Sequence, residues 1–318
     1  MNINPIPLDE LQPIGATLQR PESVIATRRG DIYVSDKRGG ILWLSATGEE
    51  RLIGSGRIVP NGIAMLRDRS FLAANITEEG GVWRVAGEPG NATVEPWLME
   101  IEGRPLIGVN FVLPDSDGHY WITVTSPHIH IGHCDHTSRD GYVIRVDDNG
   151  ARIVAEGLCW TNECRIHPDG KSLYVVETFG RRLARFRIEP NGDLSRRETL
   201  LEFEEGDYPD GLAFDVQGAV WVTSVISNRL IRLLPDGMRQ VVLNDADPNL
   251  ETFNSAYRAN GLTRAMLATA NGSRLRNISS LAFGGPDLKT VYLGSLGANA
   301  LESFRSPVAG VAPVHWQW

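Results

Sequence analysis

Short segments of alternating apolar and polar residues recur in pairs along this chain, and a tight turn joins the two members of each pair. Residues 208–224, with the sequence YPDGLAFDVQGAVWVTS, show the design: an apolar strand, a turn at 215–218 and a returning strand with period-two alternation. Five similar copies begin near residues 22, 61, 110, 162 and 280, and their turns lie roughly 40 to 50 residues apart with one longer gap. Six such units predict an all-β fold, a six-bladed β-propeller, in one domain that covers residues 1–318.

Two segments depart from the repeat. Residues 126–140 separate the second and third strands of the third blade, whereas hairpin loops usually take about two to five residues. Between blades five and six, Leu250, Phe253 and Tyr257 recur at helical spacing within the segment 244–277. The sequence therefore predicts a small helical insertion there, and the strand order places it with the long loop on the face where the inner strands begin.

The ends of these elements can also be predicted. Asp247 and Pro248 indicate the start of the first inserted helix, and a second, shorter helix is expected over 263–270. Residues 13–18 can form a strand and precede the first inner strand. We expect them to be the outermost strand of the last blade, because this pairing joins the chain ends and covers a sheet edge.

Composition and charge narrow the function classes. The chain has 42% hydrophobic residues and no apolar run near the ~18 residues of a membrane span, so a soluble protein without a membrane partner is expected. Its net charge of −8 argues against nucleic acid as a partner. The start has no basic or apolar leader, and Cys134, Cys159 and Cys164 lack zinc spacing. These features predict a cytoplasmic protein with reduced, packed cysteines. The oligomeric state stays open.

Oxygen-bearing side chains occupy the same place in the predicted blades. At the starts of the six inner strands stand Glu22, Asn61, Asn110, Asn162, Asp210 and Ser279. Asn-Gly or Asp-Gly before a strand is, taken singly, more often turn chemistry than a ligand. Their recurrence at one position favours a ring at the mouth of the central channel. Hard oxygen donors suit Ca²⁺, Mg²⁺ or Mn²⁺ better than zinc or copper.

The segments PDGLA at 209–213 and SLAFGGPDLKTVY at 280–292, in this order, resemble the regucalcin (senescence marker protein)/gluconolactonase/luciferin-regenerating enzyme family, and the resemblance covers nearly the whole chain. It implies a six-bladed propeller with one divalent metal ion on the channel axis. By position, the ligands would be Glu22, Asn110, Asn162 and Asp210. Ca²⁺ is the first choice of ion, with Mg²⁺, Mn²⁺ or Zn²⁺ as alternatives.

The implied chemistry is the opening of a lactone or related ester by a metal-activated water, with Asp210 as general base or nucleophile. Family members that act on sugar lactones commonly carry an arginine two residues before the first asparagine ligand. Gly108 stands at that place here, and Arg104 lies six residues before Asn110. This difference counts against an aldonolactone as the substrate.

A small-molecule substrate is the expected partner. The candidate substrate-binding residues are Asn61, Arg104, His128, His130, His133 and His136. The four histidines lie in the long loop, where a lid that contacts substrate is favoured over a second metal site. Three other functions stay open: a phosphotriesterase-type hydrolase, a strictosidine-synthase-like enzyme on the same propeller, and a non-catalytic binding module that depends on a divalent cation.

Overall fold

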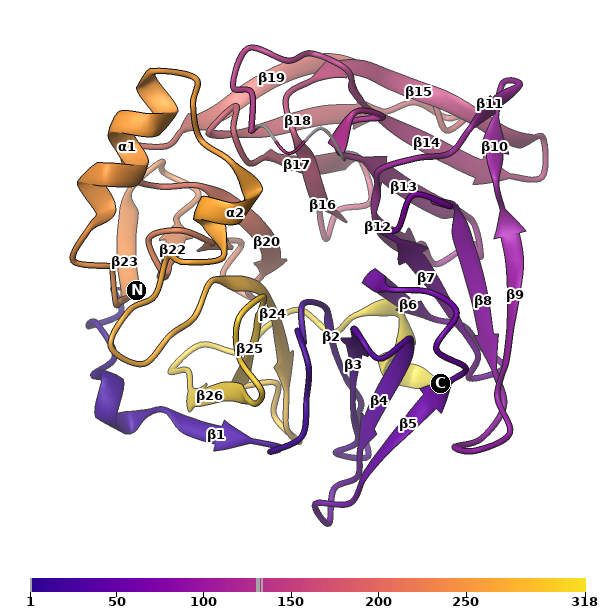
Figure 1. Ribbon diagram of the computed structural model, residues 1–318, viewed down its shortest axis with the longest axis horizontal. Coiled ribbons are helices and arrows are strands. Elements are labelled where there is room, and N and C mark those ends of the chain that lie inside the picture. Colours follow the sequence, from indigo (N-terminus) through magenta and orange to yellow (C-terminus); the bar gives the residue numbers. More distant parts are fainter. Residues whose placement is uncertain (1, 130–131, 133) are drawn as a thin grey trace.

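The computed structural model describes residues 2–129, 132 and 134–318, and these form six four-stranded antiparallel sheets around a central axis (Figure 1). The predicted six-bladed β-propeller is therefore confirmed. From the innermost strand outward, the blades are β2 (Val24–Ala26), β3 (Ile32–Asp36), β4 (Gly40–Leu44), β5 (Glu50–Gly54); β6 (Pro60–Met65), β7 (Phe71–Asn75), β8 (Val82–Ala86), β9 (Thr93–Leu98); β12 (Val109–Pro114), β13 (Tyr120–Val124), β14 (Gly141–Asp147), β15 (Gly150–Leu158); β16 (Thr161–Ile166), β17 (Ser172–Glu177), β18 (Arg182–Ile188), β19 (Leu194–Glu202); β20 (Pro209–Phe214), β21 (Val220–Ser224), β22 (Arg229–Leu233), β23 (Arg239–Asn244); and β24 (Ile278–Gly284), β25 (Thr290–Ser295), β26 (Leu301–Arg305), β1 (Gln12–Ile14).

The N-terminal segment closes the ring. Strand β1 pairs antiparallel with β26, so that Pro13 lies opposite Glu302. The predicted outermost strand is confirmed, but it ends at Ile14 rather than at residue 18. Gly15 has a φ of +78°, a left-handed conformation that glycine adopts easily and that turns the chain out of the strand. The pairing covers the edge that β26 would otherwise expose.

The core consists of hydrophobic clusters between neighbouring blades. One cluster joins Ile25 and Ile41 of the first blade to Phe71 and Trp83 of the second, and similar clusters fill the other blade junctions. Alternating residues of each strand therefore point into one junction or the next, as the period-two pattern predicted. The packed junctions hold the inner strands at fixed positions around the channel.

Two helices lie between blades five and six, as predicted: α1 (Leu250–Arg258) and α2 (Arg264–Leu267). The N-cap of α1 is Asn249, two residues later than expected, because Asp247 instead accepts a hydrogen bond from the Asn249 backbone (2.7 Å). The second helix is shorter than the predicted 263–270. Short 3₁₀ turns occur at Leu8–Glu10 and Val314–Gln317, and a two-stranded ribbon of β10 (Glu100–Ile101) and β11 (Arg104–Pro105) precedes blade three.

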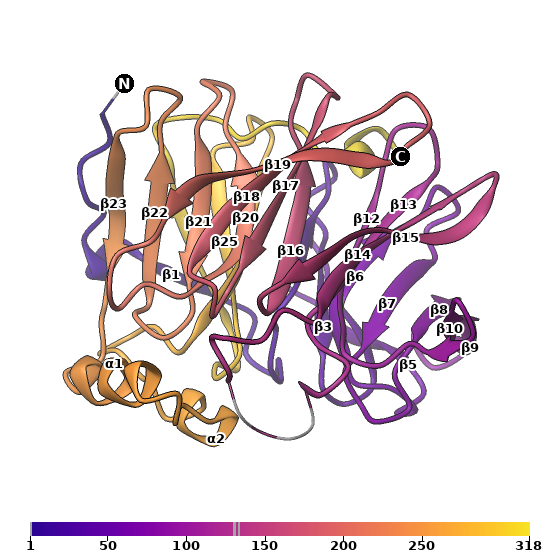
Figure 2. The same ribbon diagram turned by 90° about the horizontal axis from the view of Figure 1, so that it is seen from above.

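The helices and the long loop lie at the same end of the propeller (Figure 2). Cys134 donates its backbone N–H to Leu262 (2.9 Å), and the Arg264 N–H donates to Gly132 (3.0 Å). The predicted crowding of this face is confirmed, and the two insertions form one continuous cover beside the channel mouth. In the part of the chain that the structure describes, no helix has the length and apolar character needed to cross a membrane.

Candidate functional site

β-Bulges at the starts of the inner strands orient the side chains of the candidate site residues. The register between the first and second strands shifts between Val109 and Phe111 in blade three, with equivalent shifts in blades two, four, five and six. A bulge leaves a residue unpaired and re-aims its side chain, and bulges are frequent beside active sites. Within the shifted segments lie Asn61, Asn110, Asn162, Asp210 and Ser279.

The two predicted asparagine ligands have matching environments. Asn110 donates its amide Nδ2 to Thr125 Oγ1 (3.0 Å), and Asn162 donates its Nδ2 to Thr178 Oγ1 (3.1 Å). These bonds fix which way each amide faces. The Oδ1 atoms of both asparagines are buried and accept no hydrogen bond from the residues that the structure describes. A buried acceptor without a partner costs about 1–3 kcal/mol, so two at one site call for an explanation.

Asn61 ties two of the candidate ligands together. Its Nδ2 donates to Glu22 Oε1 (2.6 Å) and to the backbone oxygen of Asn110 (3.2 Å). Its Oδ1 accepts from Arg20 Nη2 (2.9 Å), and the same guanidinium forms an ion pair with Glu22 Oε2. The amide of Asn61, predicted to bind substrate, thus makes all its contacts inside the protein. Arg20, which the sequence pattern did not single out, lies directly at the site.

Three carboxyl groups share this end of the channel. Burial raises the pKa of Asp210 well above its usual value, and the negative charges of Glu22 and Glu163 raise it further. The pKa of Glu22 is also raised by burial, against the lowering effect of Arg20. Burial raises the pKa of Glu163 to about 7, although Arg165 lies 2.8 Å away. The channel therefore concentrates acidic groups, and burial favours their protonated forms even though Arg20 and Arg165 lie beside two of them.

The four predicted ligands fit a divalent cation by donor chemistry. The Oδ1 atoms of Asn110 and Asn162 lack partners in the part of the chain that the structure describes, and the carboxyl groups of Glu22 and Asp210 are close enough to raise the pKa of Asp210. A hard divalent cation prefers oxygen ligands of these kinds, and its charge would favour the ionised carboxylates. The structure therefore brings together the residues that the sequence singled out.

Glu163 is a site residue that sequence reasoning missed. It follows Asn162 directly, where the family often has glycine, and that substitution was the available signal. Its side chain is buried and accepts a 3.4 Å hydrogen bond from the backbone of Leu212, two residues beyond Asp210. Glu163 thus links the strand of one ligand to the strand of the next.

The described part of the histidine-rich loop packs against the inserted helices. His136 packs its ring 4.7 Å from that of Tyr257 on α1, and His128 is exposed. His130 and His133 lie outside the described residues. Beneath the helices is a buried aromatic cluster, in which Trp160 and Phe179 lie edge to face at 4.7 Å. The cluster anchors the helices to the propeller through packing.

Arg104 lies on the surface, whereas Gly108 stands two residues before the proposed ligand Asn110. Arg104 is on the exposed ribbon strand β11, 3.5 Å from Glu102. Gly108 has a φ of +74°, and a Cβ atom there would lie 2.0 Å from the backbone oxygen of Ser126. A side chain at residue 108 would therefore require the backbone to move, so the arginine found there in sugar-lactone members has no room in this conformation.

A second group of potential ligands lies at the opposite end of the channel. Ligand atoms of Asp115, Asp117 and His119 lie within 4.8 Å of one another, in the turn after β12. Asp115 already accepts hydrogen bonds from two backbone N–H groups of this turn and from Arg145 Nη1 (2.6 Å). Blade five repeats the arrangement with Asp215 and Arg232, which indicates that the aspartate here stabilises the turn.

Comparison with known proteins shows the family of this chain and agrees with its fold. Residues 20–248 match the family described as the SMP-30/Gluconolactonase/LRE-like region. This chain belongs to that family. The resemblance inferred from the sequence is thus confirmed, on a match that covers well over half of the chain.

Individual relatives within the family are distant. A 6-deoxy-6-sulfogluconolactonase from Pseudomonas putida is 30% identical over 162 residues, which are 50% of this chain and 46% of that protein. The chain spans about half the length of the curated relatives it matches. Two solved structures share the fold. A gluconolactonase from Xanthomonas campestris has 17% identity and a TM-score of 0.69, covering 93% of this chain and 89% of its own. The calcium-binding protein regucalcin from Agrobacterium tumefaciens has 15% identity and a TM-score of 0.68, covering 96% and 95%.

Proposed function

We propose that this protein is a metal-dependent hydrolase that opens lactones or closely related cyclic esters. The proposal is supported chiefly by the buried oxygens of Asn110 and Asn162, which have no partner among the described residues and lie beside the carboxyl groups of Glu22 and Asp210. Membership of a family that includes gluconolactonases supports it, as does the name of the sulfogluconolactonase relative.

The proposed metal ligands are Glu22, Asn110, Asn162 and Asp210. A bound divalent cation would polarise the ester carbonyl and acidify a water molecule. The protein supplies the orientation: Thr125 and Thr178 hold the two amides with their oxygens turned to the site, and Asn61 holds Glu22. Ca²⁺ is the first candidate ion, since all proposed ligands are oxygens and a neighbour in fold is a calcium-binding protein.

Asp210 is the proposed general base. In the reaction, water adds to the carbonyl carbon of the lactone while the Asp210 carboxylate accepts one of its protons. The ring C–O bond then breaks, and the same proton returns to the departing oxygen, which leaves a hydroxy acid. A positioned carboxylate contributes typically about 10²- to 10⁴-fold to such a step. Burial of Asp210 keeps bulk water from competing for this proton.

The test is acid release from a panel of γ- and δ-lactones, aryl esters and phosphotriesters, measured after chelation and after return of Ca²⁺, Mg²⁺ or Mn²⁺. We expect cation-dependent turnover of lactones, and a loss of at least about 100-fold in kcat for Asp210→Asn. The matched control is Asp287→Asn, which makes the same change in an exposed turn of blade six.

Three other results of these assays would contradict the proposal, and each would point to a different conclusion. Full turnover by Asp210→Asn would remove that residue from the mechanism. Turnover of phosphotriesters alone would identify the second type of hydrolase. A cation-dependent rise in melting temperature without turnover of any ester would identify a binding module.

A further inference from the structure

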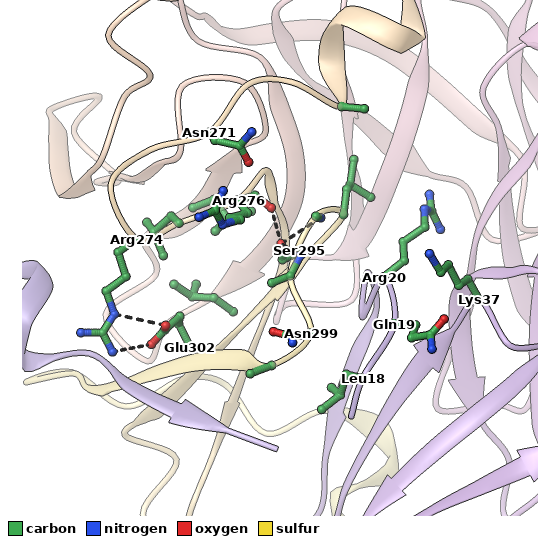
Figure 3. Close-up of a pocket in the computed structure, with 18 residues that line it drawn as sticks. Leu18, Gln19, Arg20, Lys37, Asn271, Arg274, Arg276, Ser295, Asn299 and Glu302 are labelled. Atoms are coloured by element: carbon green, nitrogen blue, oxygen red, sulfur yellow. Dashed lines mark hydrogen bonds and ion pairs between the residues drawn. The ribbon is translucent and has the colours of Figure 1, made fainter. Parts of the chain in front are cut away.

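A cavity of about 750 Å³ lies between the last and first blades, beside the inserted helices. It is within the size range of small-molecule sites, about 300–1,000 Å³. Figure 3 shows Arg20 and Lys37 on one side of the cavity and Arg276 on the other. Asn271 and Asn299 also line the cavity and contribute polar side chains to its wall.

Part of the positive charge around the cavity has no ion-pair partner in the described residues. Arg274 is turned toward Glu302 and pairs with it at 2.9 Å (Figure 3). Lys37 and Arg276 are exposed, and their side chains form no ion pair or hydrogen bond within the described ranges 2–129, 132 and 134–318. The chain as a whole has a net charge of −8, so this concentration of cations runs against the overall balance.

Arg20 connects the cavity to the proposed active site. The residue lines the cavity, while its Nη2 contacts Asn61 and Glu22. Its Nη1 is buried and has no hydrogen-bond partner among the described atoms. The cavity wall is also tied to the site by the Ser295 N–H, which donates to the Pro21 oxygen (2.8 Å), one residue before Glu22. A ligand that extends from the cavity into the proposed active site would therefore contact Arg20.

Arg264 adds a second guanidinium near this junction. As the first residue of α2, it is positioned by the Thr263 cap and by its own N–H bond to Gly132. Burial lowers the pKa of Arg264, and the positive charge of the neighbouring Arg20 lowers it further. No acidic side chain in the described part of the chain forms an ion pair with Arg264.

We propose that this cavity binds an anionic substituent of the substrate, such as a sulfonate, carboxylate or phosphate, through Arg20, Lys37 and Arg276. The inference rests on the proposed hydrolase function and specifies its substrate class: a lactone whose ring lies at Asp210 and whose charged group extends past Arg20. Arginine suits such groups because its guanidinium can donate two parallel hydrogen bonds.

The expected effect of each outer cation is modest. Lys37 and Arg276 are exposed, and exposed ion pairs are typically worth 0.2–1 kcal/mol, or roughly 1.5- to 5-fold in affinity each. Removing both should weaken anion binding by about 2- to 25-fold, and the effect should shrink with added salt because salt screens exposed charges.

A binding experiment tests the cavity without relying on turnover. The affinities of 4-hydroxypentanoate and of its 5-phosphate, the ring-opened acids of a neutral and a phosphorylated γ-lactone, are compared by calorimetry at low and high salt, with wild-type protein and with Lys37→Ala/Arg276→Ala. We expect the wild type to prefer the phosphorylated acid at least about 5-fold at low salt, and the variant to lose most of that preference. The control Arg29→Ala/Lys171→Ala removes two exposed cations at turns on the opposite face. It should keep the preference.

The same prediction is then tested by steady-state kinetics, with two lactones that carry a neutral or an anionic substituent on the same ring. The double variant should raise KM for the anionic lactone and leave kcat for both lactones, and KM for the neutral one, unchanged. Equal affinity of wild type for the two acids, or a preference that survives in the double variant, overturns the proposal. If the preference depends on Lys37 and Arg276 but no lactone is hydrolysed, the cavity assignment holds and the hydrolase proposal fails.

Discussion

A divalent cation should stabilise this protein measurably, because the oxygens of Asn110 and Asn162 have no partner in the described structure. Each costs about 1–3 kcal/mol, so the metal-free fold carries a penalty of roughly 2–6 kcal/mol that coordination would relieve. At a cation concentration of 100 times Kd, the free energy of unfolding should rise by about 2.7 kcal/mol. For 318 residues, the entropy of unfolding is about 0.7 kcal/mol/K, which converts this gain into a rise of about 4 °C in Tm.

The assay is a thermal melt in chelator and in increasing Ca²⁺, Mg²⁺ and Mn²⁺. Asn110→Ala should lose most of the cation-dependent shift, because it removes one proposed ligand. Its metal-free Tm should change little, since the lost bond to Thr125 is offset by removal of the unpartnered oxygen. Asn75→Ala is the matched control: that asparagine is also buried, but its Oδ1 accepts a hydrogen bond from Val59 (3.0 Å). Unchanged melting in all three cations, or an equal shift in Asn110→Ala, would refute the reasoning.

Three further predictions concern the rest of the fold. Arg232→Met should lower the free energy of unfolding by about 3–5 kcal/mol in a denaturant titration, because Arg232 and Asp215 form a fully buried pair and the carboxylate would be left behind. Gly108→Ala should lower it by more than about 1 kcal/mol and reduce Tm, since the added Cβ meets the Ser126 oxygen at 2.0 Å; an unchanged Tm would show that the loop relaxes freely. Burial lowers the pKa of His315 from 6.5 to about 4, so the unfolded chain binds the proton first and stability should fall by about 2–3 kcal/mol between pH 6.5 and 4. His315→Phe should remove that part of the slope, and a parallel pH profile would contradict the assignment.

The blade pattern could be predicted from the sequence because it is local. Period-two alternation and turn residues act within about ten positions, and each copy, such as that at 208–224, carries both signals. The same repeat aligned Glu22, Asn110, Asn162 and Asp210, since equivalent positions of a propeller meet at one end of the channel. The helix start was misplaced by two residues because Asp247 caps a turn before α1.

Other features of the site had no local signal. Arg20 and Asn61 are 41 positions apart, and only the packing of blade two beside blade one brings the guanidinium to the amide oxygen. The positive cavity combines residues from the first blade with Arg276, which lies beyond the inserted helices. Glu163 stands beside a recognised ligand, yet its raised pKa comes from burial that a sequence does not display.

Spacing along the chain was sufficient to predict the repeat, the number of blades, the two insertions and the common position of the oxygen-bearing residues. The direction in which the amides of Asn110 and Asn162 face, and the charges that have no partner among the described residues, became visible only in the folded chain. The reason is physical: hydrogen-bond partners and desolvation depend on atoms contributed by other blades, and those atoms meet only when the ring of blades is complete.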